Sequence, residues 1–188
     1  FVKEIGRCLD KTRARNPDVP GVMNWYRGVS QCVSHTLQPS LFRVPGKTEI
    51  EYLNLEANMM QDFRRQVLLH APAAESATAS ESLLTLFYMQ HFGVPTRLLD
   101  WTSNPLIALY FALSTDSGSS ENPAVWVVDP WAWNRKVFHG KSWGDRGPAN
   151  ANHAAVKGYK PKEGYEPGDL LRSEERRGGK ECVKQCRS

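Results

Sequence analysis

The chain has 188 residues, a hydrophobic fraction of 40% and six tryptophans, which together exclude a wholly disordered protein and fit one domain with or without a tail. Its 24 Lys and Arg residues outnumber its 20 Asp and Glu residues, so the formal net charge is +4. The longest apolar run, 106–113, is far too short to cross a membrane, and no export signal opens the chain. We therefore expect no membrane partner.

Much of the positive charge lies in the last stretch of the chain, 172–188. This segment holds six basic residues, three acidic residues and two of the four cysteines, and the rest of the chain has 18 basic and 17 acidic residues. It resembles the in-frame translation of a sequencing-library adapter, so we interpret it as a non-native tail; the alternative is a genuine basic tail that contacts RNA or an acidic partner. Without this tail the net charge is +1, which argues against nucleic acid as a partner.

The cysteines and histidines do not have the spacing of a complete metal site. Cys182 and Cys186 are spaced like half of one, but no second pair or nearby histidine completes it. Cys8 and Cys32 are expected to be reduced thiols. Reduced thiols predict a reducing compartment, and we expect a cytoplasmic protein that holds no metal.

The first predicted elements follow from apolar periodicity and from capping residues. Residues 1–16 predict an amphipathic helix, and 22–29 predicts a strand. Thr48 and Glu51 match a capping box, which predicts a helix from there to about His70. The apolar residues of that helix recur at spacings of three and four: Ile50, Leu53, Ala57, Met60, Phe63 and Val67.

A second capping box follows at Thr78 and Glu81, and it predicts a helix that stops at Gly93. The next segment, 95–103, is predicted to be extended. Period-two alternation in this segment places the side chains of Asp100 and Thr102 on one face, where they would form a polar pair.

The extended segment leads into a third helix. Ser103 or Asn104 is expected to cap it, with Pro105 at the first helical position, where a missing N–H group costs nothing. This helix, 106–114, is apolar nearly all round, so we expect it at the centre of the core.

The last predicted element is a buried strand at 124–129, after a Ser/Gly turn at 117–120. The stretch 139–171 is rich in Gly and Pro and predicts a loop or a disordered end. Because helices and short strands mix without regular alternation, we expect an α+β fold in a single domain rather than a doubly wound sheet.

Two blocks of the sequence resemble a known family. The first is Trp25-Tyr26-Arg27-Gly28-Val29-Ser30 followed by Leu37-Gln38-Pro39-Ser40-Leu41-Phe42-Arg43. The second is Gln90-His91-Phe92-Gly93-Val94-Pro95-Thr96-Arg97-Leu98-Leu99-Asp100-Trp101-Thr102-Ser103-Asn104-Pro105, which continues into Ala108-Leu109-Tyr110-Phe111-Ala112. In their order and separation these blocks resemble the FRG domain family, named for a Phe-Arg-Gly motif. The resemblance covers roughly residues 20–135.

The resemblance implies a division of the chain into four segments. We expect an N-terminal helix at 1–19, an FRG-like domain at 20–138, a loop-rich or disordered end at 139–171 and the non-native tail at 172–188. A Gln-containing motif expected further downstream in this family has no counterpart before the tail. We therefore expect the domain to be truncated at its C-terminal side and to have the other domains of a longer parent chain as partners.

The resemblance implies a cytoplasmic role in bacteria or their phages, in the conflict between the two, without a settled biochemical activity. The Arg-Gly strand, followed by a Ser/Thr motif that enters a helix, also resembles the layout of ADP-ribosyltransferases. That likeness implies a split β-sheet and NAD as a cofactor, with an arginine that anchors the dinucleotide and a Ser/Thr motif that orients the nicotinamide ribose. The chain departs from the pattern at Trp101-Thr102-Ser103, where the first serine is absent. It also lacks a late glutamate in a suitable strand context, so we expect the fragment to lack the catalytic glutamate.

The ligand-binding candidates come from both blocks: Tyr26, Arg27, Gly28, Arg97, Trp101 and Ser103. Arg27 on a strand is suited to a bidentate contact with a phosphate, and Gly28 would let a ligand approach the backbone. The alternative for Arg27 is a half-buried pairing with Asp100 or another carboxylate. Tyr26 and Trp101 are suited to stacking on a base, but aromatic residues in extended segments are more often part of the core. For Ser103, a helix cap explains the residue without any ligand.

The catalytic candidates are His91, Asp100 and Thr102. Histidine is a residue type suited to act as a general base, which makes His91 a candidate, although a histidine at a helix C-terminus is also simply favourable to the helix dipole. The sequence thus predicts an FRG-like domain that binds a nucleotide-type ligand, with ADP-ribosyltransferase activity in the intact protein as the enzymatic form of this hypothesis. The alternative is a non-catalytic protein-interaction module in a larger defence-related or mobile-element protein. The two differ in whether Arg27, His91, Asp100 and Thr102 converge on one pocket.

Overall fold

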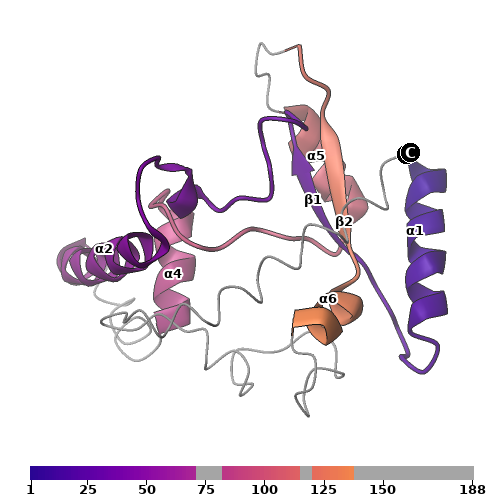
Figure 1. Ribbon diagram of the computed structural model, residues 1–188, viewed down its shortest axis with the longest axis horizontal. Coiled ribbons are helices and arrows are strands. Elements are labelled where there is room, and N and C mark those ends of the chain that lie inside the picture. Colours follow the sequence, from indigo (N-terminus) through magenta and orange to yellow (C-terminus); the bar gives the residue numbers. More distant parts are fainter. Residues whose placement is uncertain (71–81, 115–119, 138–188) are drawn as a thin grey trace. The chain divides into compact units, whose positions relative to one another are not determined.

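The computed structural model describes residues 1–70, 82–114 and 120–137. These residues form helices and a two-stranded antiparallel sheet, which confirms the predicted α+β fold class. They divide into two compact units. The first unit comprises residues 1–36 and 100–137, and the second comprises 37–99, each within the described ranges (Figure 1). The predicted capping box at 78–81, the loop-rich end and the tail lie outside the described residues, and the four predicted segment boundaries stay predictions.

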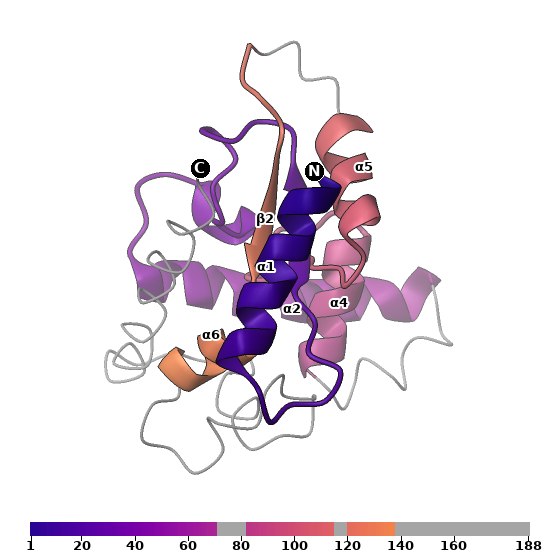
Figure 2. The same cartoon turned by 90° about the vertical axis from the view of Figure 1, so that its right-hand side faces the viewer.

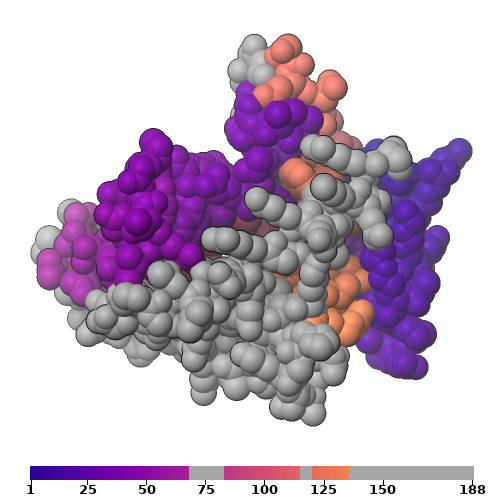
Figure 3. Space-filling model, viewed as in Figure 1, coloured from indigo at the N-terminus to yellow at the C-terminus, as the bar shows by residue number. Residues whose placement is uncertain are grey.

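The first unit is built on strands β1 (Trp25–Val29) and β2 (Ala124–Val128), which pair antiparallel with Arg27 opposite Trp126. Both strands are rich in aromatic and β-branched residues, which suit a pleated, half-buried surface. Three helices accompany them: α1 (Val2–Arg15), α5 (Pro105–Ser114) and α6 (Pro130–Val137). Figure 2 shows α1 in front of β2, with α5 beside them. In the space-filling view, α1 forms one edge of the molecule (Figure 3).

Helix α5 contacts the sheet through its smallest residues. Ala108 and Ala112, one turn apart, are buried against β1 at Gly28. Five large apolar residues of α5 are instead 45–66% exposed: Leu106, Ile107, Tyr110, Phe111 and Leu113. The expectation that this helix lies at the centre of the core is therefore wrong, because the close helix–sheet contact uses only the alanine stripe.

The start of α5 follows the predicted chemistry. Pro105 is its first residue, and the Asn104 side chain accepts a hydrogen bond from the N–H of Leu106 at 2.9 Å. Of the two expected caps, Asn104 is therefore the one used. Ser103 lies one residue too early, because the helix begins at Pro105.

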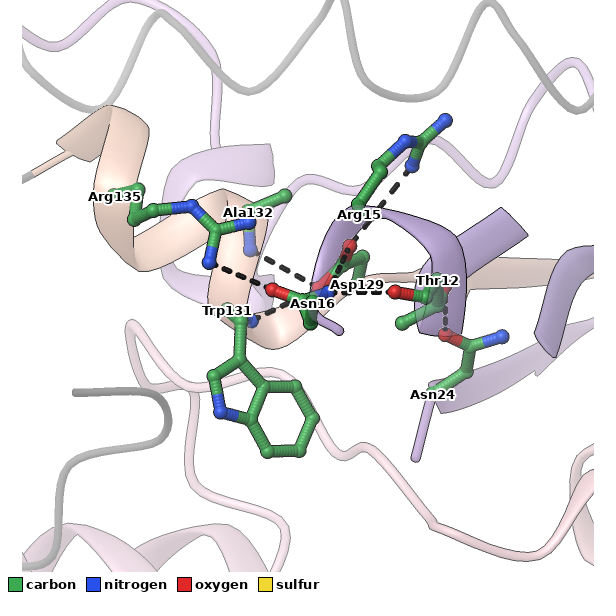
Figure 4. A network of polar contacts seen from close by, with 8 residues as sticks. All are labelled: Thr12, Arg15, Asn16, Asn24, Asp129, Trp131, Ala132 and Arg135. Carbon is green, nitrogen blue, oxygen red and sulfur yellow. Dashed lines mark hydrogen bonds and ion pairs between the residues drawn. The ribbon is translucent and has the colours of Figure 1, made fainter. Parts of the chain in front are cut away.

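A buried carboxylate begins α6, a helix that the periodicity analysis did not predict. Asp129 accepts hydrogen bonds from the backbone N–H groups of Trp131 and Ala132 at 3.1 and 3.0 Å (Figure 4). The predicted strand at 124–129 ends one residue early because Asp129 serves as this N-cap. The Asp-Pro pair at 129–130 was the available signal, since it has the cap and first-position residue types of a helix start.

The same carboxylate is tied to the C-terminal end of α1. The Asn16 amide donates to Asp129 at 3.2 Å and to the carbonyl of Thr12 at 2.8 Å, and Arg135 donates to the Asn16 side-chain oxygen at 2.6 Å (Figure 4). Thr12 in turn donates to the Asn24 side chain at 2.6 Å. This network joins α1, the entry to β1, the end of β2 and the start of α6, so the first unit is fixed by polar as well as apolar contacts.

The second unit packs α2 (Glu49–His70) against α4 (Ser82–His91), with a short 3-10 helix η1 (Ser40–Arg43) beside α2. Its core is formed by Met60, Leu86 and Met89. The capping box before α2 is confirmed, because the backbone N–H of Thr48 donates to Glu51 at 2.6 Å and the Thr48 hydroxyl accepts from the N–H of Glu51 at 3.4 Å. Gly93 follows α4 at φ 78°, which confirms the predicted stop, since this left-handed conformation favours glycine.

Candidate ligand-binding site

Backbone pairing brings part of each block together inside the first unit, namely 25–30 from the first and 100–105 from the second. The N–H and C=O groups of Tyr26 pair with the C=O and N–H groups of Thr102, at 2.8 and 2.9 Å, which adds a short antiparallel bridge beside β1. The Arg27 guanidinium donates from Nη1 to the backbone carbonyl of Asp100 at 2.7 Å, across 73 positions of sequence. The predicted residues Arg27, Asp100, Trp101, Thr102 and Ser103 therefore belong to one structural neighbourhood.

The two faces of the sheet carry different side chains, because successive residues of a strand point to opposite faces. Trp25 and Arg27 lie on one face, together with Trp126, which is directly opposite Arg27 in the antiparallel register. All three are half-buried. We call this the Arg27 face, and it combines one permanent cation with two indole rings.

The opposite face is occupied by the protein's own helices. A methyl group placed on Gly28 would lie 2.7 Å from the backbone N of Ala112 and closer still to the carbonyl oxygen of Ala108. The glycine of this motif therefore has a packing explanation, namely the close approach of α5, and its proposed role in ligand approach stays a prediction.

Tyr26 is on the helix-covered face and is only 4% exposed. Burial raises the pKa of its hydroxyl, and a hydrogen bond with the buried Asn24 side chain acts in the opposite direction. Its ring is part of the core, which is the alternative that the sequence left open. Trp101, by contrast, is half-buried.

The Thr102 hydroxyl accepts a hydrogen bond from the N–H of Asn104 at 3.1 Å, so it helps to turn the chain into α5. Asp100 and Ser103 are exposed. The catalytic roles of Asp100 and Thr102 stay predictions, as does the ligand contact of Ser103.

Arg97 and His91 belong to the second unit. Arg97 forms an ion pair with Glu56 through Nε and Nη2, its backbone N–H donates to the same carboxylate at 2.8 Å, and Glu56 is fully buried. Arg97 thus anchors the segment after α4 onto α2. The ligand role predicted for it stays a prediction.

Glu56 was missed by the sequence analysis. It lies on the buried stripe of α2 with Leu53, Ala57 and Met60, so a charged residue at an apolar position was the available signal. A buried carboxylate needs a partner, and here the partner is 41 positions away.

His91 is the last residue of α4 and is exposed, with its ring edge-to-face against Phe92 at a centroid distance of 5.2 Å. This position matches the helix-terminus alternative for the residue. Its role as a general base, and its convergence with Arg27, stay predictions.

A groove of about 190 Å³ lies within the first unit, between α1, α5 and β2. It is mainly apolar, with the Glu4 and Cys8 side chains among its lining residues, and it includes Val125 and Val127 from the helix-covered face of the sheet. None of the predicted site residues lines this groove.

Comparison with known protein families gives one match, to the model of the FRG domain, over residues 23–121. The chain belongs to the FRG domain family. No curated protein and no solved structure matches it. The match includes Arg27, the segment from His91 to Ser103 and Glu56, and it ends shortly before β2.

The described residues of this FRG domain contain neither a metal-binding cluster nor a helix that could span a membrane. No group of three or more His, Cys, Asp or Glu side chains is arranged to hold a metal ion in 1–70, 82–114 or 120–137. Over the same part of the chain, no helix has both the length and the apolar character to cross a membrane.

The loop after β1 is held by Glu121, which lies three residues before β2. Its side chain accepts hydrogen bonds from the backbone N–H groups of Val33 and Ser34, both at 3.0 Å, and from the Ser34 hydroxyl. These bonds favour the charged carboxylate and lower the pKa of Glu121 below its ordinary value of 4.5, mainly through Ser34. Glu121 therefore has a structural function in this unit.

This contact predicts a local pH dependence. The pKa of Glu121 is lowered in the folded protein. The stabilisation by its hydrogen bonds to Val33 and Ser34 is therefore fully present above the ordinary pKa of 4.5 and is lost as the pH falls through the lower folded pKa. The Val33 and Ser34 amide resonances should shift together in that acidic range when followed by NMR. In Glu121→Gln this shared transition should vanish, and its persistence would assign it to another group.

Proposed function

We propose that this FRG domain binds a nucleotide-type ligand on the Arg27 face. The observation that carries the proposal is the 2.7 Å hydrogen bond from Arg27 to the Asp100 carbonyl, which links the cation of the first block to the backbone of the second. This hydrogen bond holds the Arg27 guanidinium in a defined orientation. Such an oriented guanidinium is well suited to bidentate recognition of a phosphate.

The neighbouring aromatic residues support the same ligand class. Trp25 and Trp101 are half-buried, so part of each indole is open to solvent. Aromatic side chains next to a cation are the usual means of holding a base while its phosphate is bound. A nucleotide supplies both groups in one molecule.

The likeness to ADP-ribosyltransferases makes NAD the first dinucleotide to test. In this extension of the proposal, Arg27 holds the diphosphate, Thr102 and Ser103 adjoin the ribose, and Asp100 supplies acid–base chemistry. The reaction to test in the intact protein is ADP-ribosyl transfer, in a cytoplasmic role in bacteria or their phages.

The binding proposal is tested by calorimetric titration of the chain with NAD and with ADP-ribose. Replacing Arg27 with Gln should weaken binding by about 10-fold or more, the loss expected for a charge-assisted hydrogen-bonded contact. Arg13→Gln is a matched control, because Arg13 is an exposed arginine of the same unit. It forms an ion pair on α1, with its Nη1 atom 3.7 Å from Oδ1 of Asp10. Thermal unfolding of both variants checks their folding. Unchanged affinity in Arg27→Gln would remove Arg27 from the site, and no binding by the unmodified chain would overturn the proposal.

A second candidate, a protein-interaction module, is favoured by the exposed apolar residues of α5. A monomeric protein rarely exposes such a continuous set, and the other domains of a longer parent chain are the partner to test. Oxidative footprinting should then label Tyr110 and Phe111, which are 66% and 58% exposed, less in the longer parent than in this chain. Equal labelling in both would contradict this candidate.

A further inference from the structure

We infer that Trp126 is part of the ligand site, with its indole ring as the stacking surface and its Nε1–H as a hydrogen-bond donor to the ligand. This inference rests on the proposed nucleotide site and names the part of that site that recognises the planar ring. Trp126 lies outside both family blocks and outside the residues that the family model matches.

The sheet register places Trp126 beside Arg27. The two residues are direct partners in the antiparallel pairing of β1 with β2. Directly opposite side chains of such a pair share a face, with their Cβ atoms about 5 Å apart. A ligand group bound by the Arg27 guanidinium therefore adjoins the Trp126 indole without any change in the backbone.

The Nε1–H group of Trp126 has an unmet hydrogen-bonding capacity. It is buried, and no acceptor for it is present among the residues that the structure describes. Buried indole N–H groups usually have a partner, because burying a polar group without one is unfavourable. The unmet Trp126 donor, on the same face as Arg27, favours a ligand that carries a hydrogen-bond acceptor.

Helices α1 and α5 pack on the other face of the sheet, although Val29 and Val128, at the ends of the Arg27 face, are also buried. The groove between α1, α5 and β2 includes Val125 and Val127, which alternate with Trp126 and so point to the other side of the sheet. The close packing of α5 on Gly28 is also on that other side. The chemistry that fits the Arg27 face is a phosphate or diphosphate joined to a flat heteroaromatic ring, as in a nucleoside diphosphate.

The test uses calorimetry with two probes, ADP-ribose and inorganic phosphate. Trp126→Phe keeps an aromatic ring but removes the donor, and it should weaken ADP-ribose binding several-fold. Trp126→Leu removes stacking as well and should weaken it by about 10- to 100-fold. Neither variant should change phosphate binding, whereas Arg27→Gln should weaken the binding of both probes. Trp131→Phe on α6 is the matched control and should bind ADP-ribose like the unmodified chain.

The outcomes separate this inference from the proposed function. If both Trp126 variants bind ADP-ribose with unchanged affinity while Arg27→Gln loses it, Trp126 is not in the site and the nucleotide proposal stands. If Trp126→Leu fails to fold, Trp126→Phe decides the question, and unchanged affinity in that variant overturns the assigned donor. If both Trp126 variants weaken the binding of phosphate and of ADP-ribose equally, the substitutions act by disturbing Arg27, and the assigned contact between the indole and the ligand ring is wrong. No ADP-ribose binding by the unmodified chain overturns both proposals.

Discussion

Replacing Glu56 with Gln should lower the free energy of unfolding by about 3 kcal/mol or more, because it leaves the Arg97 guanidinium buried without its counter-charge. The Glu56 carboxylate is fully buried and accepts hydrogen bonds from both the side chain and the backbone N–H group of Arg97. Urea unfolding followed by circular dichroism at 222 nm measures the effect, since α2 and α4 supply helical signal in this unit.

A second acidic residue of α2 provides the control. Asp62 pairs with Arg65 at 3.1 Å, with side chains 66% and 74% exposed, so Asp62→Asn should change the free energy of unfolding by no more than about 0.5 kcal/mol. The double variant Glu56→Gln with Arg97→Met should recover part of the loss, because it removes the buried charge. A Glu56→Gln variant as stable as Asp62→Asn would show that the ion pair does not hold this unit together.

Replacing Gly28 with Ala should lower the free energy of unfolding by about 3 kcal/mol, at the upper end of the usual range for an overpacked core. The added methyl group meets backbone atoms of Ala108 and Ala112, which cannot move aside as a side-chain tip can. To accept it, α5 must separate from β1. Chemical unfolding followed by tryptophan fluorescence measures the change.

Gly6 is the matched control for this substitution. It lies inside α1, and a methyl group placed there meets no atom within 4 Å. Because alanine is the better helix former, Gly6→Ala should stabilise the chain by about 0.5–1 kcal/mol. If Gly28→Ala is tolerated as well as Gly6→Ala, the close helix–sheet contact is not part of the native fold.

The Gly28 result also bears on how the Arg-Gly motif is interpreted. The two residues point to opposite faces of β1: the glycine admits α5, and the arginine faces the side with Trp126. One motif thus combines a packing requirement with a proposed binding function. A Gly28→Ala variant that loses ligand affinity would therefore not by itself show that a ligand contacts Gly28.

Local signals in the sequence predicted the parts of the fold that depend on neighbouring residues. The Thr48 and Glu51 capping box, the stop at Gly93 and the helix start at Pro105 are all confirmed. Each depends on contacts within about four residues, so the pattern contains the information that determines it.

The contacts that define the candidate site depend on residues far apart in the chain. The Tyr26 bridge to Thr102 and the pairing of Arg27 with Trp126 follow from strand register, which no local pattern encodes. The exposure of α5 was mispredicted for a similar reason. Which faces of an apolar helix are buried depends on the elements that pack against it, and these come from distant parts of the chain. Glu56 could have been identified from the sequence as a charged residue on an apolar stripe, but its partner, Arg97, could not have been identified in this way.

Binding of a nucleotide-type ligand to the Arg27 face can be observed by NMR of the tryptophan indole N–H groups during titration with ADP-ribose. We expect a saturable shift of the Trp126 indole resonance, with little change for Trp131 and Trp133 on α6. The Trp126 shift should disappear in Arg27→Gln. Saturating ADP-ribose that leaves the Trp126 resonance unmoved, or that shifts only the α6 tryptophans, would contradict the proposed binding.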